Sequence, residues 1–368
     1  MKKNVKRIIA VLFAAVMVFA LAACGKSGGG SDEPAGSGSA AAPAADTTGK
    51  TVIKVTCFNG ENDFMCQQLL HVCDYVEAHD DTIYFDKYLN SQYCTLIEEF
   101  ANLSDGSIDM CALMESAGQA SAMLSLFQYA RPADTCADAV VKCNAILNDD
   151  PETSPLLLGQ AAEHNIIPLG YSITGVDAFC STKPATTLDD LAKGKLGCTN
   201  AMTSSLYEAM GLNVEVVQMQ DIYESLSRGK VDSTTIPISV MVANKLYEVA
   251  PYVLTSKKGG CSGLITLNLD TWNKLTPEQQ QLFRDGYKEA QKWAAEEYDK
   301  LFQSNVEEME AAGATVNLMT EEDDALKNKV QLQSTWASGS AVAEQQGILD
   351  EYTLIFNKGL EGSGLSID

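Results

Sequence analysis

Short apolar runs alternate with longer segments of helical periodicity along most of the chain. The runs at 52–57, 108–113 and 166–173 are typical of buried strands, and a shorter strand is predicted at 82–85. Segments 62–78 and 96–103 place apolar side chains every three or four positions, which predicts amphipathic helices. This alternation predicts an α/β fold with parallel sheets covered on both faces.

The alternation starts again near Gly175. Apolar runs at 195–198, 214–217 and 233–236 predict short strands with helices between them, and another strand is predicted at 264–269. The module from residue 51 onward is long enough for two lobes of ordinary size. We therefore assign residues 51–174 plus about 260–320, including a spanning helix, to lobe I and residues 175–259 plus about 321–368 to lobe II.

That spanning helix is the clearest single element. Thr276 suits the N-cap, Pro277 the first helical position and Gly313 the position after the C-cap. The roughly 36 residues from 277 to 312 would span roughly 54 Å, which is more than the diameter of one lobe. Their apolar positions lack a strict heptad, so a helix packed along both lobes is favoured over a coiled-coil arm. Strand 314–319 and a final helix at 348–356 are predicted beyond it.

The first 50 residues have a different composition. Four basic residues precede an apolar run at 8–21, which is short for a spanning helix and typical of a secretory signal. The run ends in Leu21-Ala22-Ala23-Cys24, which is similar to the lipobox of bacterial lipoproteins. We interpret residues 1–23 as a lipoprotein signal peptide, and residues 24–50 as a lipidated Cys24 with a flexible Gly-, Ser-, Ala- and Pro-rich linker. The alternative is an ordinary signal peptide with a chance cysteine.

The charge narrows the possible partners. The formal net charge is −23, and removal of the basic signal makes the mature chain more acidic still. This argues against nucleic-acid binding and against adsorption to anionic lipid. The expected location is the extracytoplasmic face of the cell membrane, with the lipid on Cys24 as the anchor.

Catalytic motifs fail one by one. The three histidines lack metal-ligand spacing, no Cys-x-x-Cys pair occurs, and no glycine-rich phosphate loop lies outside the linker. The segment from Gly170 to Gly175 misses the nucleophile-elbow spacing by one residue. Besides Cys24, the cysteines are either buried thiols or partly paired in disulfides, and both possibilities stay open. We predict a binding protein rather than an enzyme, with no cofactor and no metal.

A series of short segments resembles the DctP-type solute receptors of TRAP transporters. Each segment is weak alone, but their order and spacing along the chain are specific. They are Gly106-Ser107-Ile108-Asp109-Met110, Thr186-Thr187-Leu188-Asp189-Asp190-Leu191 with Lys195-Leu196, Gln220-Asp221-Ile222-Tyr223-Glu224-Ser225-Leu226, Gly229-Lys230-Val231-Asp232, Lys245-Leu246-Tyr247-Glu248-Val249-Ala250 and Asn268-Leu269-Asp270-Thr271-Trp272-Asn273-Lys274-Leu275.

The resemblance implies a type II periplasmic-binding-protein fold, in which hinge strands join two lobes and the long helix spans both. It also implies that a small solute binds in the interlobe cleft and is delivered to TRAP membrane permease subunits. Closure would follow from population shift, because the ligand contacts both lobes only in the closed state.

Departures from the family concern the ligand. Many members clamp the ligand carboxylate with an arginine, and Gly197 takes that position here. A supporting family arginine falls on Asp177, and a family acid falls on Thr235. We therefore hypothesise a ligand that is not a simple carboxylate held in the usual way, such as a neutral or amine-bearing solute. The alternative is that Arg131 or Lys183 replaces the missing arginine.

Ligand contacts are expected at the carboxyl ends of strands, where open α/β sheets bind ligands. Asp63 is a further candidate acid beside them. The expected residues are Asn59, Glu61, Asn62, Glu115, Arg131, Asp177, Gly197, Thr199, Asn200 and Thr235. Two other functions fit the same chain, a lipoprotein that senses a ligand for a membrane signalling partner and an exported α/β hydrolase.

Overall fold

The computed structural model describes residues 47–114, 122–123, 135–199, 201–256 and 260–362. Of residues 177, 201, 202 and 260–262 only the backbone is described. Four residues of interest, Cys24, Glu115, Arg131 and Asn200, lie outside the described residues. Residues 47–368 belong to one compact unit, and the fold below is that of this unit.

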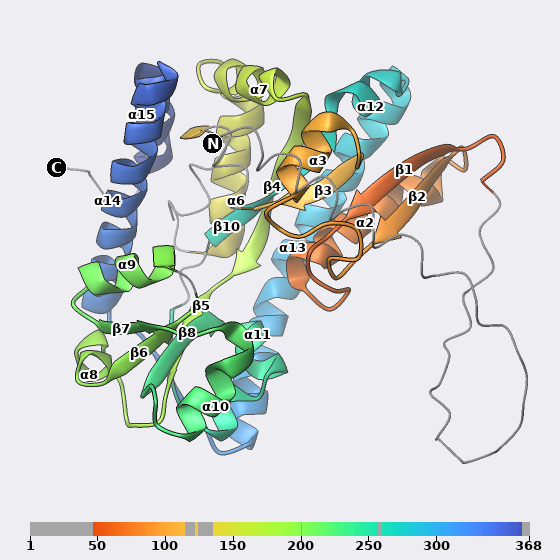
Figure 1. Cartoon of the computed structure of the whole chain (residues 1–368). Helices are drawn as coiled ribbons and strands as arrows, with labels where there is room; N and C mark the ends of the chain where they lie inside the picture. The colour runs from red at the N-terminus through yellow and green to blue at the C-terminus, as the bar shows by residue number, and fades with distance from the viewer. Residues whose placement is uncertain (1–46, 115–121, 124–134, 200, 257–259, 363–368) are drawn as a thin grey trace, which may run out of the picture. The chain divides into compact units, whose positions relative to one another are not determined.

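The described strands form two sheets, which are the centres of the two lobes (Figure 1). The first sheet has five strands in the order β2-β1-β3-β10-β4, and we call it with its helices lobe I. Its strands are β1 (Thr51–Thr56), β2 (Ile83–Tyr88), β3 (Met110–Leu113), β4 (Ile166–Gly175) and β10 (Gly260–Asn268). β1, β2 and β3 are parallel, while β10 runs antiparallel between β3 and β4.

The second sheet, the centre of lobe II, has six strands in the order β11-β9-β5-β8-β6-β7. They are β5 (Asp177–Ser181), β6 (Lys195–Cys198), β7 (Asn213–Val216), β8 (Ser233–Pro237), β9 (Tyr252–Thr255) and β11 (Thr315–Leu318). β5 lies antiparallel to both β8 and β9. The sequence analysis did not predict β5 or β9.

Both sheets are therefore mixed, and the prediction of parallel sheets was wrong in this respect. The reason is the way the chain passes between the lobes. It leaves lobe I through β4 into β5 and returns through β9 into β10, so each sheet contains one strand that enters against the direction of its neighbours. The two crossings run side by side, because Gly175 pairs with Gly260 in one sheet and Ala178 with Thr255 in the other.

Helices cover both faces of each sheet, as predicted (Figure 1). Lobe I carries α2 (Phe64–His79), α3 (Glu99–Asp105), α6 (Cys136–Asn144), the π-helical turn η1 (Ala145–Asp149), α7 (Ser154–Glu163) and α12 (Leu269–Lys274). Lobe II carries α8 (Leu188–Ala192), α9 (Ala201–Ala209), η2 (Met219–Asp221), α10 (Ile222–Ser227), α11 (Ile238–Ala243) and η3 (Leu246–Glu248).

The long helix α13 (Pro277–Ala311) confirms the predicted spine. Thr276 and Gln279 form a reciprocal capping box at its start, which satisfies two amide donors of the first turn. The helix contacts α2 and β4 in lobe I and then α11 and β11 in lobe II. Its apolar positions are buried against these elements rather than against a second coil.

The C-terminal helices correct the predicted division of the chain. β11 pairs with β9, so residues 315–318 belong to lobe II and not to lobe I. α14 (Glu321–Gln346) starts on lobe II, where Asp323 accepts a hydrogen bond from the backbone N–H of Leu188. α15 (Leu349–Leu360) returns to lobe I, where Lys358 pairs with Asp150 at 3.3 Å. The tail predicted for lobe II therefore ends on lobe I.

Cysteines contribute to the cores. Cys57, Cys66, Cys73, Cys94, Cys111, Cys180 and Cys198 are buried free thiols. Burial raises the pKa of Cys180 and of Cys198 to about 12, which keeps both thiols protonated and unreactive at neutral pH. For these seven residues the structure therefore decides in favour of thiols.

Candidate functional site

The carboxyl ends of strands in both lobes meet the crossing segments. In lobe I, β1, β2 and β3 run in the same direction as β4, which ends at the crossing residue Gly175. In lobe II, β6 and β7 run parallel to β8, whose last residue Pro237 pairs with Asp177 just after the crossing. The loops that follow these strands are therefore at the sheet edges where ligands bind in open α/β sheets.

The loop after β1 carries three predicted contacts. Asn59 is half-buried, and its carbonyl accepts a hydrogen bond of 2.8 Å from the backbone N–H of Asn90. Glu61 and Asn62 are exposed. The candidate acid Asp63 has a structural task, because it is the N-cap of α2 and accepts from the backbone N–H groups of Met65 and Cys66.

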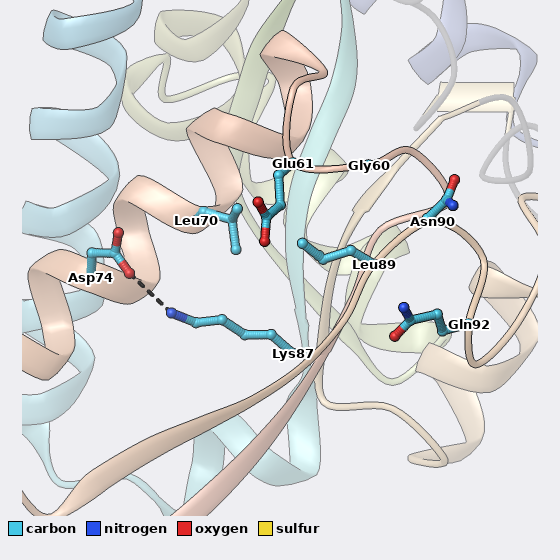
Figure 2. A pocket seen from close by; sticks show the side chains of 8 residues that line it. All are labelled: Gly60, Glu61, Leu70, Asp74, Lys87, Leu89, Asn90 and Gln92. Carbon is cyan, nitrogen blue, oxygen red and sulfur yellow. Dashed lines mark hydrogen bonds and ion pairs between the residues drawn. The ribbon is translucent and has the colours of Figure 1, made fainter. Parts of the chain in front are cut away.

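Glu61 belongs to a groove formed by lobe I alone (Figure 2). The groove has a volume of about 600 Å³, and its carboxylate-bearing side chain Glu61 extends into the hollow. Lys87 on the opposite wall pairs with Asp74 at 2.9 Å and with Glu77 at 3.3 Å. The lining residues are Gly60, Glu61, Leu70, Asp74, Lys87, Leu89, Asn90 and Gln92. The groove does not bring Glu61 together with the lobe II candidates.

Thr235 and Thr199 lie near the carboxyl ends of β8 and β6. Thr235 is buried, and its Oγ1 lies 3.1 Å from Oη of Tyr207 on α9. Thr199 follows β6 and is half-buried. Asp177 begins β5, opposite Pro237, and the structure describes only its backbone. Tyr207 was placed on a helix by the sequence but was not predicted as a site residue.

Gly197 faces a packed layer. A Cβ atom at this position would lie 3.3 Å from Cγ2 of Val231 and 3.5 Å from Cγ2 of Val217. Its carbonyl accepts a hydrogen bond of 2.8 Å from Thr234 Oγ1. A side chain at residue 197 would therefore have to pass between these valines before it reached solvent.

Lys183, one proposed substitute for the family arginine, lies at the wrong end of the sheet. Its Nζ is 2.6 Å from Asp232, which directly precedes β8, and Asp232 also accepts from the backbone N–H of Lys195 at the start of β6. Lys183 holds the pKa of Asp232 below its ordinary value, and the Lys195 amide adds to this effect. Lys183 therefore stabilises the amino-terminal edge of the sheet, opposite the candidate site.

Replacing Lys183 with methionine should leave solute binding unchanged. The Lys183 side chain is 65 % exposed, so loss of its ion pair should lower the free energy of unfolding by less than about 1 kcal/mol. Thermal unfolding with and without bound solute measures both quantities. A large loss of affinity in Lys183→Met would contradict its placement away from the site.

Side chains from three helices hold the end of β4 before the crossing. The backbone N–H and C=O of Ile173 bond to the amide of Gln68 on α2, at 3.0 and 2.8 Å. Tyr298 on α13 accepts a hydrogen bond of 2.8 Å from the backbone N–H of Val176, immediately after Gly175. The crossing is therefore tied to the spine that contacts both lobes. The sequence showed these helices only as apolar periods, so it did not reveal these polar contacts.

The sequence model of the bacterial extracellular solute-binding protein family 7, DctP, matches residues 58–336. The chain belongs to this family. The match covers the strands of both lobes and most of the spine, and it agrees with the order of segments that suggested the resemblance. The family consists of solute-binding proteins that act outside the cytoplasm.

Curated relatives are more distant. The chain is 25 % identical over 173 residues to an uncharacterised protein of Haemophilus influenzae, which covers 46 % of this chain and 52 % of that protein. It is also 25 % identical over 167 residues to the ectoine-binding periplasmic protein TeaA of Halomonas elongata, covering 45 % and 49 % of the two chains. The chain thus spans about half the length of the curated relatives it matches.

Solved structures show the same fold along the whole module. TeaA without ligand superposes with a TM-score of 0.69 at 19 % identity and covers 83 % of this chain and 100 % of its own. A TRAP periplasmic solute-binding protein from Desulfovibrio salexigens with bound orotic acid has a TM-score of 0.67 at 18 % identity and covers 84 % and 100 %. The fold of this family member is therefore the two-lobed periplasmic-binding fold.

Two features of the described residues bear on its chemistry. None of the described helices is both long enough and apolar enough to cross a membrane. In the same part of the chain, no three His, Cys, Asp or Glu side chains are grouped so that they could hold a metal ion.

Proposed function

We propose that this protein is an extracytoplasmic receptor that encloses a small solute between its lobes and delivers it to a TRAP-type membrane permease. The observation that carries the proposal is the meeting of strand ends from both sheets at the paired crossings, with α13 in contact with both lobes. Such an arrangement offers a ligand two half-sites that belong to different lobes.

The mechanism follows from this division. A solute that contacts only one lobe in the open state and both lobes in the closed state binds the closed state more tightly, and so shifts the population toward it. The two adjacent crossings and α13 restrict the movement to rotation about the connection. The permease would then distinguish the closed, loaded receptor from the open one.

The N-terminal segment supports attachment to the membrane. Cys24 follows small residues at the end of the apolar signal run, and its lipid would hold the receptor close to the permease through the linker at 25–50. Mass spectrometry of the N-terminal peptide from native membranes tests this proposal through the mass of a diacylated Cys24.

Relatives indicate the range of solutes. Proteins of this fold have been solved with orotic acid, with β-D-galacturonate and with L-gulonate, and TeaA is named as an ectoine-binding protein. These solutes are small, polar and mostly anionic. The proposed contacts in this chain are Thr199 and Thr235 in lobe II and Asn59 and Asn62 in lobe I, together with Glu115, Arg131, Asp177 and Asn200.

The proposed function predicts that the purified protein carries or captures an unaltered small molecule. Protein from its native host is denatured, and the released compounds are identified by mass spectrometry and added back in a thermal-shift assay. We expect a stoichiometric compound that raises the melting temperature and is recovered chemically unchanged. Conversion of the compound during incubation would support an exported hydrolase instead. Binding that persists while uptake is intact in a strain without the permease genes would favour a sensor.

A further inference from the structure

The buried face of α14 is polar. Asp324, Lys327, Gln331 and Thr335 recur every three or four residues, so they share one face of the helix, and all four are buried. Lys327 is only 1 % exposed, whereas its neighbour Leu326 is 41 % exposed. An ordinary surface helix turns apolar residues inward and charged residues outward, so this part of α14 has the opposite orientation.

Polar side chains also face this stripe from lobe II. Nζ of Lys327 lies 6.0 Å from the ring centroid of Phe179 on β5, which stacks edge-on against Tyr207 of α9 at 5.2 Å. The hydroxyl of Tyr207 meets that of Thr235, and α14 contacts α9 directly. Lys327 therefore lies on the same face of the sheet as Thr235, where the family resemblance places polar ligand contacts.

Such a layer is costly without a polar occupant. A buried ammonium loses its hydration, and contact with the Phe179 ring returns only a small part of that free energy. Oε1 of Gln331, one turn further along the same face, accepts no hydrogen bond from any described residue although Gln331 is only 6 % exposed. Leucine or methionine at both positions would pack there without this cost.

We propose that Lys327 supplies the positive charge that pairs with an anionic group of the solute, in place of the arginine that Gly197 lacks. This inference rests on the proposed function and specifies its ligand class as a small organic acid. A lysine ammonium is a point charge without the fixed two-pronged geometry of arginine, so it can pair with a carboxylate through a single oxygen. Gln331 lies on the same face to contact the remaining polar atoms of the solute.

The test compares Lys327→Met with Lys329→Met. Lys329 is on the same helix but exposed, so both variants lose one charge and differ only in its place. Each protein is titrated by calorimetry with succinate, D-gluconate and glycerol 3-phosphate, and with their neutral analogues succinamide, D-glucitol and glycerol. Any compound recovered from the native host joins the panel. Circular dichroism confirms folding, and Lys327→Arg serves as the variant that restores the charge.

We expect at least one acid to bind the wild-type protein more tightly than its neutral analogue. Lys327→Met should weaken that acid by at least about 30-fold, Lys329→Met should change it by less than about twofold, and Lys327→Arg should recover part of the preference. Unchanged acid binding in Lys327→Met overturns the inference, as does a wild-type preference for neutral or amine-bearing compounds. A wild-type protein that takes up no small molecule, from the panel or from its host, instead contradicts the proposed function itself.

Discussion

A Glu99→Gln variant is expected to be more stable than the wild-type protein at pH 8 and nearly equal to it at about pH 4. Glu99 starts α3 and is completely buried, and neither carboxyl oxygen has a hydrogen-bond partner of ordinary geometry among the described residues. Burial raises the pKa of Glu99 from 4.5 to about 8, and the backbone amide of Phe58 offsets this only in part. The carboxyl group is therefore protonated in the folded protein at neutral pH.

The sign of the effect follows from proton linkage. Between pH 4.5 and pH 8 the unfolded chain loses the proton of Glu99 while the folded chain keeps it, so the free energy of unfolding falls as the pH rises. Each pH unit in this interval is worth about 1.4 kcal/mol, so Glu99 costs at most about 5 kcal/mol above pH 8. Glutamine does not titrate and has nearly the same shape, so the variant should lack this decline.

Urea unfolding at several pH values between about 4 and 9 measures the difference. Other titrating groups contribute to both proteins, so the difference between the two curves isolates Glu99. The facing groups Cys57, Cys94 and Cys111 have raised pKa values and stay protonated through this range. The control is Glu98→Gln. Glu98 is exposed, and hydrogen bonds from Thr95 lower its pKa, so its replacement should have a small effect of opposite sign. Parallel curves for Glu99→Gln and wild type would contradict the prediction.

A Gly170→Ala variant should lose about 3 kcal/mol of folding free energy. Gly170 lies on β4, the edge strand of the lobe I sheet, and a Cβ atom there would overlap Oη of Tyr287 and Oδ1 of Asn144. Tyr287 donates to the carbonyl of Tyr171 at 2.5 Å, and Asn144 accepts from its backbone N–H at 2.8 Å. The methyl group would therefore displace the side chains that satisfy the open edge of β4 close to the crossing.

The matched control is Gly159→Ala. Gly159 is exposed on α7, nothing lies within 4 Å of a Cβ placed there, and alanine favours a helix over glycine by about 1 kcal/mol. Urea unfolding should thus show opposite shifts for the two alanine variants. Adding Tyr287→Phe to Gly170→Ala should recover part of the loss, because the overlapping hydroxyl is gone. A Gly170→Ala protein as stable as wild type would mean that β4 is not held in the way the structure shows.

Elements with a strong local signal were predicted well. β6 occupies the predicted residues 195–198, and α13 begins at Pro277 behind the predicted cap Thr276. Caps and apolar periods act over a few residues, so the sequence contains all the information that these elements need. β5 and β9 were missed because each is short and exists only through pairing with the other and with β8.

The candidate site was predicted less well, since side-chain direction depends on packing. Glu61 and Thr235 both follow strand ends, but Glu61 enters a lobe I groove while Thr235 contacts Tyr207. Lys183 was a plausible cation by type, yet pairing with Asp232 places it at the opposite edge. Lys327 attracted no notice, because a polar stripe on a helix ordinarily faces solvent.

By itself the sequence determined the two-lobed α/β class, the spine and membership of a solute-receptor type, because periodicity, caps and ordered motifs are properties of neighbouring residues. The tertiary structure alone decided which strands cross between the lobes, which acids are occupied as caps or ion pairs, and that Lys327 is buried. Those outcomes depend on contacts between residues far apart in the chain, and the free energy of burying a charge is set by the side chains that surround it after folding.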